Sequence, residues 1–194
     1  MFAVLASSVQ GAGGISRVDA GAHDALYAFI GPRESLIAGV TFFGNNATIV
    51  TLVVLVALGL VLAKRIGLAV RVVFASGLGG ILVVTLKQIF QRARPIEQLL
   101  PAGGFSFPSG HAFAATVFYG MMVVLVWRLT DRRWARALAA LLGPLVILAV
   151  GLSRVYLNVH YLSDVLAGWS IGLAWLVASL LLIDTIEYRA RAKR

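Results

Sequence analysis

Lys87 and Arg94 form the first of three short clusters whose residue types could bind and transfer a phosphoryl group. They are separated by about two helical turns, so both side chains can point the same way if the helix that carries Lys87 continues. Pro95 would then end that helix. Two cations on one face can clamp an oxyanion, and arginine binds phosphate oxygens through a bidentate fork. Alone, such a pair also fits basic side chains that snorkel at the end of a membrane span.

The second cluster is the segment Ser106-Phe-Pro-Ser-Gly-His111. Proline, serine and glycine at the start of a helix leave free backbone N–H groups, which bind anions together with the positive end of the helix dipole. Ser109 and Gly110 would provide those groups, and Gly110 would let a phosphate approach the backbone closely. His111 would then lie beside the bound anion. The alternative is an ordinary capped helix with a histidine at the membrane interface.

The third cluster runs from Ser153 to Asp164. His160 and Asp164 are four positions apart, which makes their side chains neighbours if both lie on one helix. An aspartate that accepts a hydrogen bond from one imidazole nitrogen fixes the tautomer and leaves the other nitrogen free as a nucleophile. Arg154 adds a third cation. The alternative is a carboxylate that pairs with a histidine only to cap the helix.

The three clusters together predict one site for phosphoryl transfer. Lys87, Arg94 and Arg154 would surround a single anion, and the two histidines and Asp164 would act on it. Ionisable groups at membrane spans are costly and usually functional. Three fixed cations can supply the stabilisation that Mg²⁺ gives elsewhere, so we expect no metal ion and no other cofactor. The chain has no cysteine, which excludes thiolate metal sites and a cysteine nucleophile.

The composition places these clusters between membrane-spanning helices. Hydrophobic residues make up 60% of the chain and charged residues only 13%, about half the share in soluble domains. Apolar runs long enough to cross a bilayer recur along the chain, and a backbone surrounded by lipid must be helical. The sequence therefore predicts an all-α integral membrane protein, a single domain over residues 1–194. Its bundle would contain five transmembrane helices: Ala47–Ala63, Leu68–Leu86, Ala112–Trp127, Ala135–Leu152 and Val165–Ile183.

The first 45 residues fit this pattern less well. Ala25–Phe43 is apolar overall, but Pro32, Arg33 and Glu34 interrupt its centre. We expect residues 1–45 to form an interfacial or partial-span segment. A sixth transmembrane helix would exist only if this segment supplied it.

The basic residues indicate how the bundle crosses the membrane. Most of the 17 lysines and arginines lie in two alternate loops and the tail, which share one face: Lys64, Arg65, Arg71, Arg128, Arg132, Arg133, Arg136, Arg189, Arg191, Lys193 and Arg194. The positive-inside rule makes that face cytoplasmic. The net charge of +9 is then a signal of topology and of attraction to anionic phospholipids, so no nucleic-acid partner is expected. The three clusters fall on the opposite, periplasmic or extracellular face.

The same residues resemble the signature of the type 2 phosphatidic acid phosphatase superfamily, the lipid phosphate phosphatases. That signature has a lysine and an Arg-Pro pair separated by six residues, then Pro-Ser-Gly-His, then Ser-Arg, five residues, His, three residues and Asp. Every fixed position is met, by Lys87, Arg94, Pro95, Pro108, Ser109, Gly110, His111, Ser153, Arg154, His160 and Asp164. The flanking residues look like those of bacterial membrane-bound members, which usually have six spans.

The resemblance implies a role for each residue. His160 would attack phosphorus and form a phosphohistidine, Asp164 would orient it, and His111 would protonate the leaving oxygen. The phosphoryl oxygens would be held by Lys87, Arg94, Arg154 and the Ser109–Gly110 backbone. The resemblance also implies an enzyme of the bacterial inner membrane. Its substrate would be a membrane lipid that carries a phosphate or pyrophosphate, with undecaprenyl pyrophosphate or phosphatidylglycerol phosphate favoured.

Two other functions compete with this interpretation. Vanadate-dependent haloperoxidases share the anion site, but they are soluble and longer, and five spans argue against them. A non-catalytic binder or transporter of lipid phosphates needs the cations but needs neither His111 nor the pair formed by His160 and Asp164. The presence of these three residues therefore favours turnover.

Overall fold

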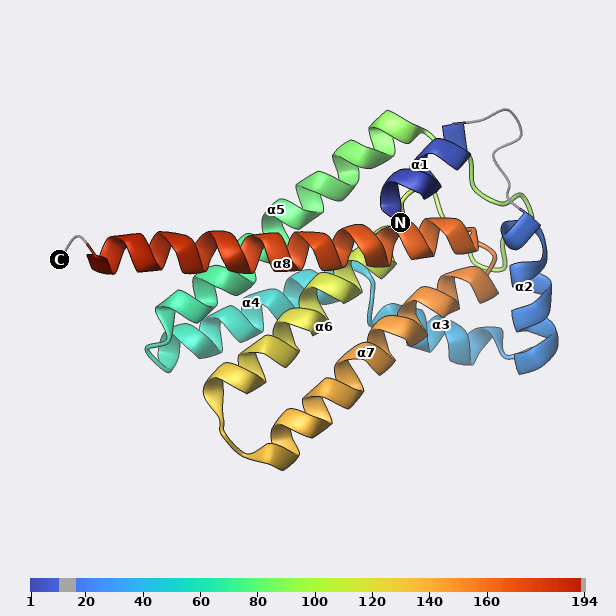
Figure 1. The fold of residues 1–194 in the computed structure, drawn as a ribbon. Coiled ribbons are helices and arrows are strands. Elements are labelled where there is room, and N and C mark those ends of the chain that lie inside the picture. Colours follow the sequence, from blue (N-terminus) through green and yellow to red (C-terminus); the bar gives the residue numbers. More distant parts are fainter. Residues whose placement is uncertain (11–16, 193–194) are drawn as a thin grey trace.

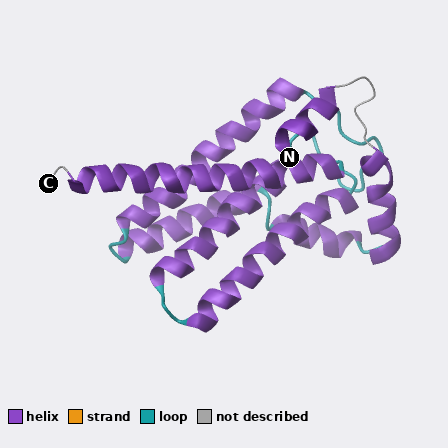
Figure 2. Ribbon diagram, in the orientation of Figure 1, coloured by secondary structure: helices purple, strands orange, loops and turns teal. Residues whose placement is uncertain are grey.

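The computed structural model describes residues 1–10 and 17–192, and helices are the only regular secondary structure in these ranges (Figure 1; Figure 2). The helices are α1 (Phe2–Gln10), α2 (Arg17–Ile30), α3 (Glu34–Phe42), α4 (Asn46–Leu62), α5 (Ile66–Phe90), α6 (Gly110–Leu129), α7 (Arg133–Tyr156) and α8 (Leu162–Ala192). Lys193 and Arg194, from the predicted basic tail, lie outside the described residues.

Within the described ranges, five helical segments are long and apolar enough to cross a membrane, which confirms the five predicted spans. Four of them lie in the single helices α5 to α8. The fifth, Glu34–Leu62, consists of α3 and α4 with a short turn between them. In this turn the Asn45 side chain accepts a hydrogen bond from the Ala47 N–H at 2.9 Å. This span therefore begins before Ala47, because α3 extends the apolar run toward the N-terminus.

The interruption around Pro32 is a break between α2 and α3. Gly31 has a φ of 75°, a left-handed conformation that favours glycine. The hydroxyl of Tyr156, at the end of α7, donates to the Gly31 carbonyl oxygen at 2.6 Å and accepts from the Arg33 N–H at 2.8 Å. α2 consequently lies across the end of the bundle instead of continuing it (Figure 1).

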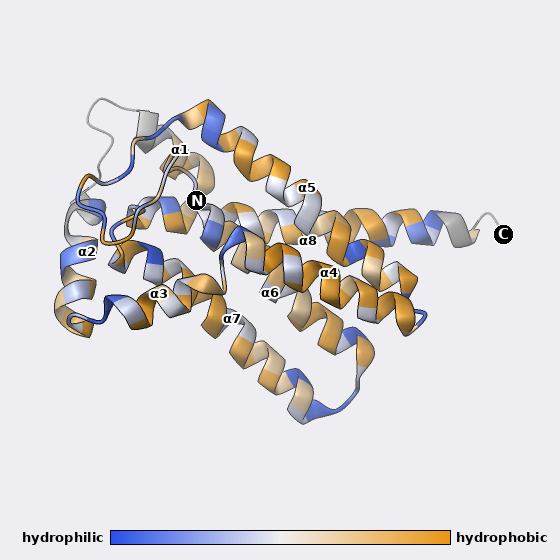
Figure 3. Ribbon diagram, turned by 180° about the vertical axis from the view of Figure 1, so that it is seen from behind, coloured by the Kyte–Doolittle hydropathy of each residue, from blue (hydrophilic) through white to orange (hydrophobic). Residues whose placement is uncertain are grey.

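α6 is the central helix of the bundle. Its buried residues Phe113, Val117, Met121 and Leu125 recur every fourth position and pack with residues of α4, α5 and α8. Many large apolar residues of the other spans are exposed. The ribbon coloured by hydropathy shows how far hydrophobic residues extend along these helices (Figure 3). Such a surface is unusual for a protein in water and is the expected one for helices that contact lipid.

Glycine permits the close approach of neighbouring spans at two places. A Cβ atom at Gly168 of α8 would stand only 2.6 Å from the carbonyl oxygen of Ser109, just before α6. A Cβ atom at Gly79, in a patch of small residues on α5, would stand 2.8 Å from Nε1 of Trp175. The first contact brings the beginning of α8 against the beginning of α6.

A buried arginine and two half-exposed carboxylates join the spans at the end of the bundle where the basic loops gather. Arg71 of α5 is 3% exposed and donates to Asp184 at 2.5 Å and to Glu187 at 2.9 Å, both on α8. Arg128 of α6 also reaches Asp184, at 3.0 Å. The loops that follow α5 and α7, in and beside which the three clusters lie, are at the other end (Figure 1).

We predict that Gly168→Ala lowers the free energy of unfolding by about 1–3 kcal/mol, because the added methyl group must push α8 away from the backbone before α6. Thermal unfolding in detergent micelles should show a lower Tm. Gly59→Ala is the matched control, since a Cβ atom at this position of α4 meets nothing within 4 Å. An unchanged Tm for Gly168→Ala would contradict the close approach of the two helices.

Candidate active site

The three clusters meet at one end of the bundle. Lys87 lies in the last turn of α5, the second cluster leads into α6, and the third joins α7 to α8. The loop between α5 and α6 folds back over this end, where the Ser109 N–H donates to the carbonyl oxygen of Asp164 at 2.9 Å. The structure thus brings together the residues that the sequence places in one site.

His160 lies in the turn between α7 and α8, before the helix that carries Asp164, so the two residues do not share a helix. Its side chain is only 2% exposed. Nδ1 is 3.4 Å from Oδ2 of Asp164, and Nε2 is 3.1 Å from Nη1 of Arg94. Because a guanidinium can only donate, Nε2 is the acceptor and Nδ1 carries the proton. This is the tautomer that the aspartate was expected to fix.

Asp164 is completely buried in the first turn of α8. Its Oδ2 accepts hydrogen bonds from the Ser106 hydroxyl and, at 2.9 Å, from the Tyr161 N–H. Its Oδ1 accepts from Arg92 at 2.6 Å. The carboxylate therefore has a fixed orientation toward His160 that does not depend on that one contact.

Burial lowers the pKa of His160 from its ordinary value of 6.5 to about 4, although the hydrogen bond with Asp164 opposes the shift. The imidazole is therefore neutral at pH 7, which leaves a nitrogen lone pair available for attack. Burial also lowers the pKa of Arg94. A guanidinium nevertheless remains charged at physiological pH.

The three predicted cations have no carboxylate partner within the described part of the chain. Lys87 and Arg94 donate to backbone carbonyl oxygens of the loop 103–106 at 2.6 to 3.3 Å. Arg154 donates to the Thr41 hydroxyl at 2.7 Å, and its Nε is buried without a hydrogen-bond partner. Because no carboxylate neutralises them, the three side chains make the site electropositive and suited to an anion.

A pocket of about 310 Å³ opens onto this electropositive site. Arg94, His111 and Arg154 line it, together with residues of the neighbouring loops: Thr41, Asn45, Leu100, Pro101, Ala102 and Gly103. We call this space the cationic pocket. His111 thus faces the same space as two of the three cations.

The helix that carries Lys87 ends earlier than the sequence predicts. Gln91 takes a left-handed φ of 45°, and its N–H donates to the Lys87 carbonyl oxygen at 3.0 Å. This C-cap ends α5 before Pro95 is reached. Arg94 therefore lies in the loop beyond the helix, where its bond to the Val159 carbonyl oxygen, at 2.7 Å, helps to fix it.

α6 begins where the second cluster predicts, with one correction. Ser109 is the N-cap, and its hydroxyl accepts from the Ala112 N–H at 3.5 Å. The sequence suggested that the Ser109 N–H would bind an anion. This N–H instead donates to the carbonyl oxygen of Asp164 and is not available to an anion. Gly110 and His111 are the first residues of the helix, where N–H groups have no acceptor within the helix and the dipole is positive.

A buried network behind the site escaped the sequence analysis. It consists of Asp19, Arg92, Ser106 and Ser163, which connect α2 and the loop after α5 to Asp164. Arg92 stands two positions before Arg94, so the presence of a second arginine in the first cluster could have indicated a further buried ion pair. Asp19 had no local signal, because it lies in the N-terminal segment and far from Asp164 in the sequence.

Comparisons with known proteins agree with this geometry. The family model described as the PAP2 superfamily matches residues 68–188. The chain is 30% identical over 142 residues to phosphatidylglycerophosphatase B of Bacillus subtilis, which covers 72% of this chain and 70% of that protein. It is 33% identical over 118 residues to an undecaprenyl-diphosphatase of Sulfolobus acidocaldarius, which covers 58% of this chain and 52% of that protein.

Two solved structures share the fold. A transmembrane PAP2 type phosphatidylglycerolphosphate phosphatase from Bacillus subtilis superposes with a TM-score of 0.83 at 26% identity, over 97% of this chain and 92% of that one. LpxE of Aquifex aeolicus superposes with a TM-score of 0.63 at 21% identity, over 86% and 99% of the two chains, which shows likeness of fold.

The helical bundle, its lipid-facing surface and the cationic pocket define an integral membrane protein of the phosphatase class. The chain belongs to the PAP2 superfamily.

Proposed function

We propose that the protein is a membrane-bound phosphatase that hydrolyses a phosphomonoester or pyrophosphate bond of a lipid through a phosphohistidine intermediate. One observation carries the proposal: buried, neutral His160 has Nδ1 directed at Asp164 and Nε2 directed at Arg94 of the cationic pocket. The Nε2 lone pair accepts from Arg94, so it would face the phosphorus of an anion that takes over the hydrogen bonds of this arginine, as nucleophilic attack requires.

In the first step, Nε2 of His160 attacks phosphorus in line and a nitrogen–phosphorus bond forms. The bond from phosphorus to the leaving oxygen breaks, and protonated His111 gives its proton to that oxygen. Asp164 stabilises the positive charge that develops on the imidazole. Lys87, Arg94 and Arg154 stabilise the phosphoryl oxygens as their charge redistributes.

In the second step, His111 takes a proton from water, and the water oxygen attacks the phosphoryl group. The nitrogen–phosphorus bond breaks, inorganic phosphate leaves, and His160 returns to its neutral state while His111 is again protonated. The three cations supply the positive charge that other phosphoryl-transfer enzymes obtain from Mg²⁺, so this mechanism uses no metal ion and no other cofactor.

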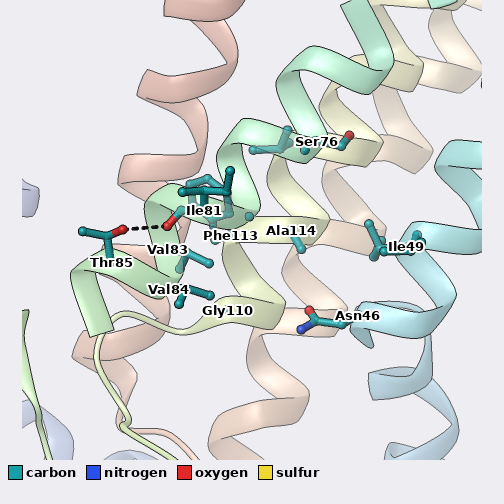
Figure 4. A pocket seen from close by; sticks show the side chains of 14 residues that line it. Asn46, Ile49, Ser76, Ile81, Val83, Val84, Thr85, Gly110, Phe113 and Ala114 are labelled. Atoms are coloured by element: carbon teal, nitrogen blue, oxygen red, sulfur yellow. Dashed lines mark hydrogen bonds between the residues drawn. The ribbon is translucent and has the colours of Figure 1, made fainter. Parts of the chain in front are cut away.

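An apolar groove supports a lipid substrate. It has a volume of about 500 Å³ between α4, α5 and α6, and its walls include Ile49, Val84 and Phe113 (Figure 4). Gly110, the first residue of α6, also lines this groove, and a Cβ atom there would stand 3.8 Å from Cε of Lys87. A lipid tail in the groove would therefore place its phosphate at the start of α6, beside the cations.

The arrangement of charge supports a site on the outer face of a bacterial inner membrane. Arg71 and Arg128 lie at the end of the bundle opposite to His160, as do the other basic residues of their loops. If that end is cytoplasmic, as the positive-inside rule indicates, the site faces the periplasm or the exterior. The names of the two relatives favour phosphatidylglycerol phosphate or undecaprenyl pyrophosphate as the substrate.

The covalent intermediate provides the first test. Protein incubated with a lipid labelled on its phosphoryl group should retain label after denaturation in alkali. We predict that His160→Ala abolishes this labelling and turnover, whereas His111→Ala retains some labelling, because His111 supplies only the proton. Both reactions should proceed in excess EDTA. Labelling that persists without His160, or turnover that needs added Mg²⁺, would contradict the mechanism.

The pH dependence provides a second test. Because the pKa of His160 is lowered to about 4, acid removes the neutral nucleophile only well below the ordinary histidine value. We therefore expect the acid limb of kcat/KM for phosphate release to lie well below pH 6.5. An acid limb centred near the ordinary value would argue against His160 as the nucleophile.

The groove provides a third test. Gly80 lines it, and a Cβ atom there meets nothing within 4 Å. Gly80→Leu should fill part of the groove. We predict that kcat/KM for phosphatidylglycerol phosphate falls about tenfold relative to that for a soluble aryl phosphate, since a lost apolar contact is worth about 1–3 kcal/mol. Gly59→Leu, outside the groove, should leave this ratio unchanged. A constant ratio for Gly80→Leu would exclude the groove as the tail site.

A further inference from the structure

A buried chain of charged side chains reaches Asp164 from behind the cationic pocket. The guanidinium of Arg92 donates to Oδ2 of Asp19 at 2.9 Å on one side and to Oδ1 of Asp164 at 2.6 Å on the other. None of the three side chains is more than 6% exposed. A planar guanidinium held between two carboxylates fixes the orientation of both.

Ser163 connects the same residues a second time. Its hydroxyl accepts from Nη1 of Arg92 at 2.7 Å and donates to Oδ2 of Asp19 at 2.6 Å. Its N–H donates to Oδ1 of Asp19 at 2.8 Å. Asp19, on α2, thereby caps the first turn of α8 at the residue next to Asp164.

The two oxygens of Asp164 have different partners. Oδ2 lies on the side of His160, whereas Oδ1 accepts from Arg92. A cation beside a carboxylate weakens its effect on a third group, and a second carboxylate on the far side of that cation partly restores it. The charge of Asp19 thus determines how strongly Asp164 acts on His160.

We propose that Asp19 and Arg92 are positioning residues. They hold Asp164 against His160 and determine how strongly the Asp164 carboxylate stabilises positive charge on the His160 ring. Neither residue lines the cationic pocket, although Asp19 and His160 both line a separate pocket of about 410 Å³. The hydrogen bonds connect Asp19 to Asp164 through Arg92. The inference rests on the proposed function, in which His160 is the nucleophile. It gives α2, outside the five spans, a part in the reaction.

The groups that face His160 determine the sign of the expected change. Asp164 of α8 favours the imidazolium, whereas Lys87 of α5, Arg94 of the following loop and His111 of α6 disfavour it. Loss of the Asp19 charge alters none of these groups directly and leaves Arg92 to act on Asp164 alone. The pKa of His160 should therefore fall, and its orientation should become less fixed.

Asp19→Asn tests the proposal, because it removes the charge and keeps an oxygen for the Ser163 N–H. We expect kcat for phosphate release to fall about tenfold to a hundredfold, as for other residues that orient a catalytic group, with KM within about twofold. The acid limb of the pH profile should move to lower pH. Asp24→Asn removes the same charge from an exposed position of α2 and should leave kcat and the acid limb unchanged.

A purely structural role for Asp19 predicts a different result. It would reduce the amount of active protein, so kcat and the amplitude of phosphohistidine labelling would fall in proportion while the acid limb stayed in place. That result, or an unchanged kcat, overturns the proposal. If Asp19→Asn does not fold, Arg92→Lys is tested in the same way, since an ammonium keeps the charge but cannot fork to both carboxylates.

NMR of protein labelled with ¹⁵N-histidine separates this inference from the proposed function. In the unmodified protein, the His160 ring should show one protonated and one unprotonated nitrogen at pH 7. In Asp19→Asn, its titration should move to lower pH. An unmoved His160 titration overturns the role of Asp19. Failure of the unmodified protein to release phosphate from any lipid phosphate overturns the proposed function instead.

Discussion

The burial of one carboxylate, that of Asp164, organises the catalytic end of the bundle. An unpaired ion in such a place would cost several kcal/mol, so its partners must be in position when the spans pack together. Arg92 and the Ser106 hydroxyl arrive from the loop after α5, and the Tyr161 N–H comes from the turn before α8. The backbone carbonyl of the same aspartate accepts from Ser109 at the start of α6. The hydrogen bonds of this one buried aspartate therefore hold three separate segments together. These segments carry His160, Arg94 and His111.

Cations that stabilise the fold differ from those of the site in the groups that they bind. Arg71 and Arg92 are buried and paired with two carboxylates each. Lys87, Arg94 and Arg154 bind carbonyl oxygens, a hydroxyl and an imidazole, none of which neutralises a cation. Carboxylates of the chain therefore neutralise Arg71 and Arg92, whereas in the described part of the chain no carboxylate pairs with the other three cations. Arg92 and Arg94 stand two positions apart and have opposite uses, which shows that the distinction comes from tertiary packing.

The sequence predicts those features that depend on local composition or on spacing within one segment. Apolar runs indicate the five spans because lipid imposes helix on them, and the position of Ser109 as an N-cap follows from residue type. The end of α5 at Gln91 was not predictable, since a left-handed glutamine gives no signal comparable to the proline that follows. Asp19 was not predictable either. Its role depends on α2 turning across the end of the bundle, and this turn is fixed by Tyr156, a residue of another helix.

Gly110 lies where the apolar groove and the cationic pocket meet. It begins α6 and lines the apolar groove, while the next residue, His111, lines the cationic pocket. Packing within the chain does not require glycine here, because an added Cβ atom would meet only Cε of Lys87, at 3.8 Å, which is ordinary van der Waals contact. Gly168 is the opposite case, since a Cβ atom there would collide with the backbone at 2.6 Å. The fold itself thus explains Gly168, whereas we infer that Gly110 leaves room for a phosphate to approach the first N–H groups of the helix. An anion at that point has cations on one side and an apolar groove on the other, which is the division of polarity found in a lipid phosphate.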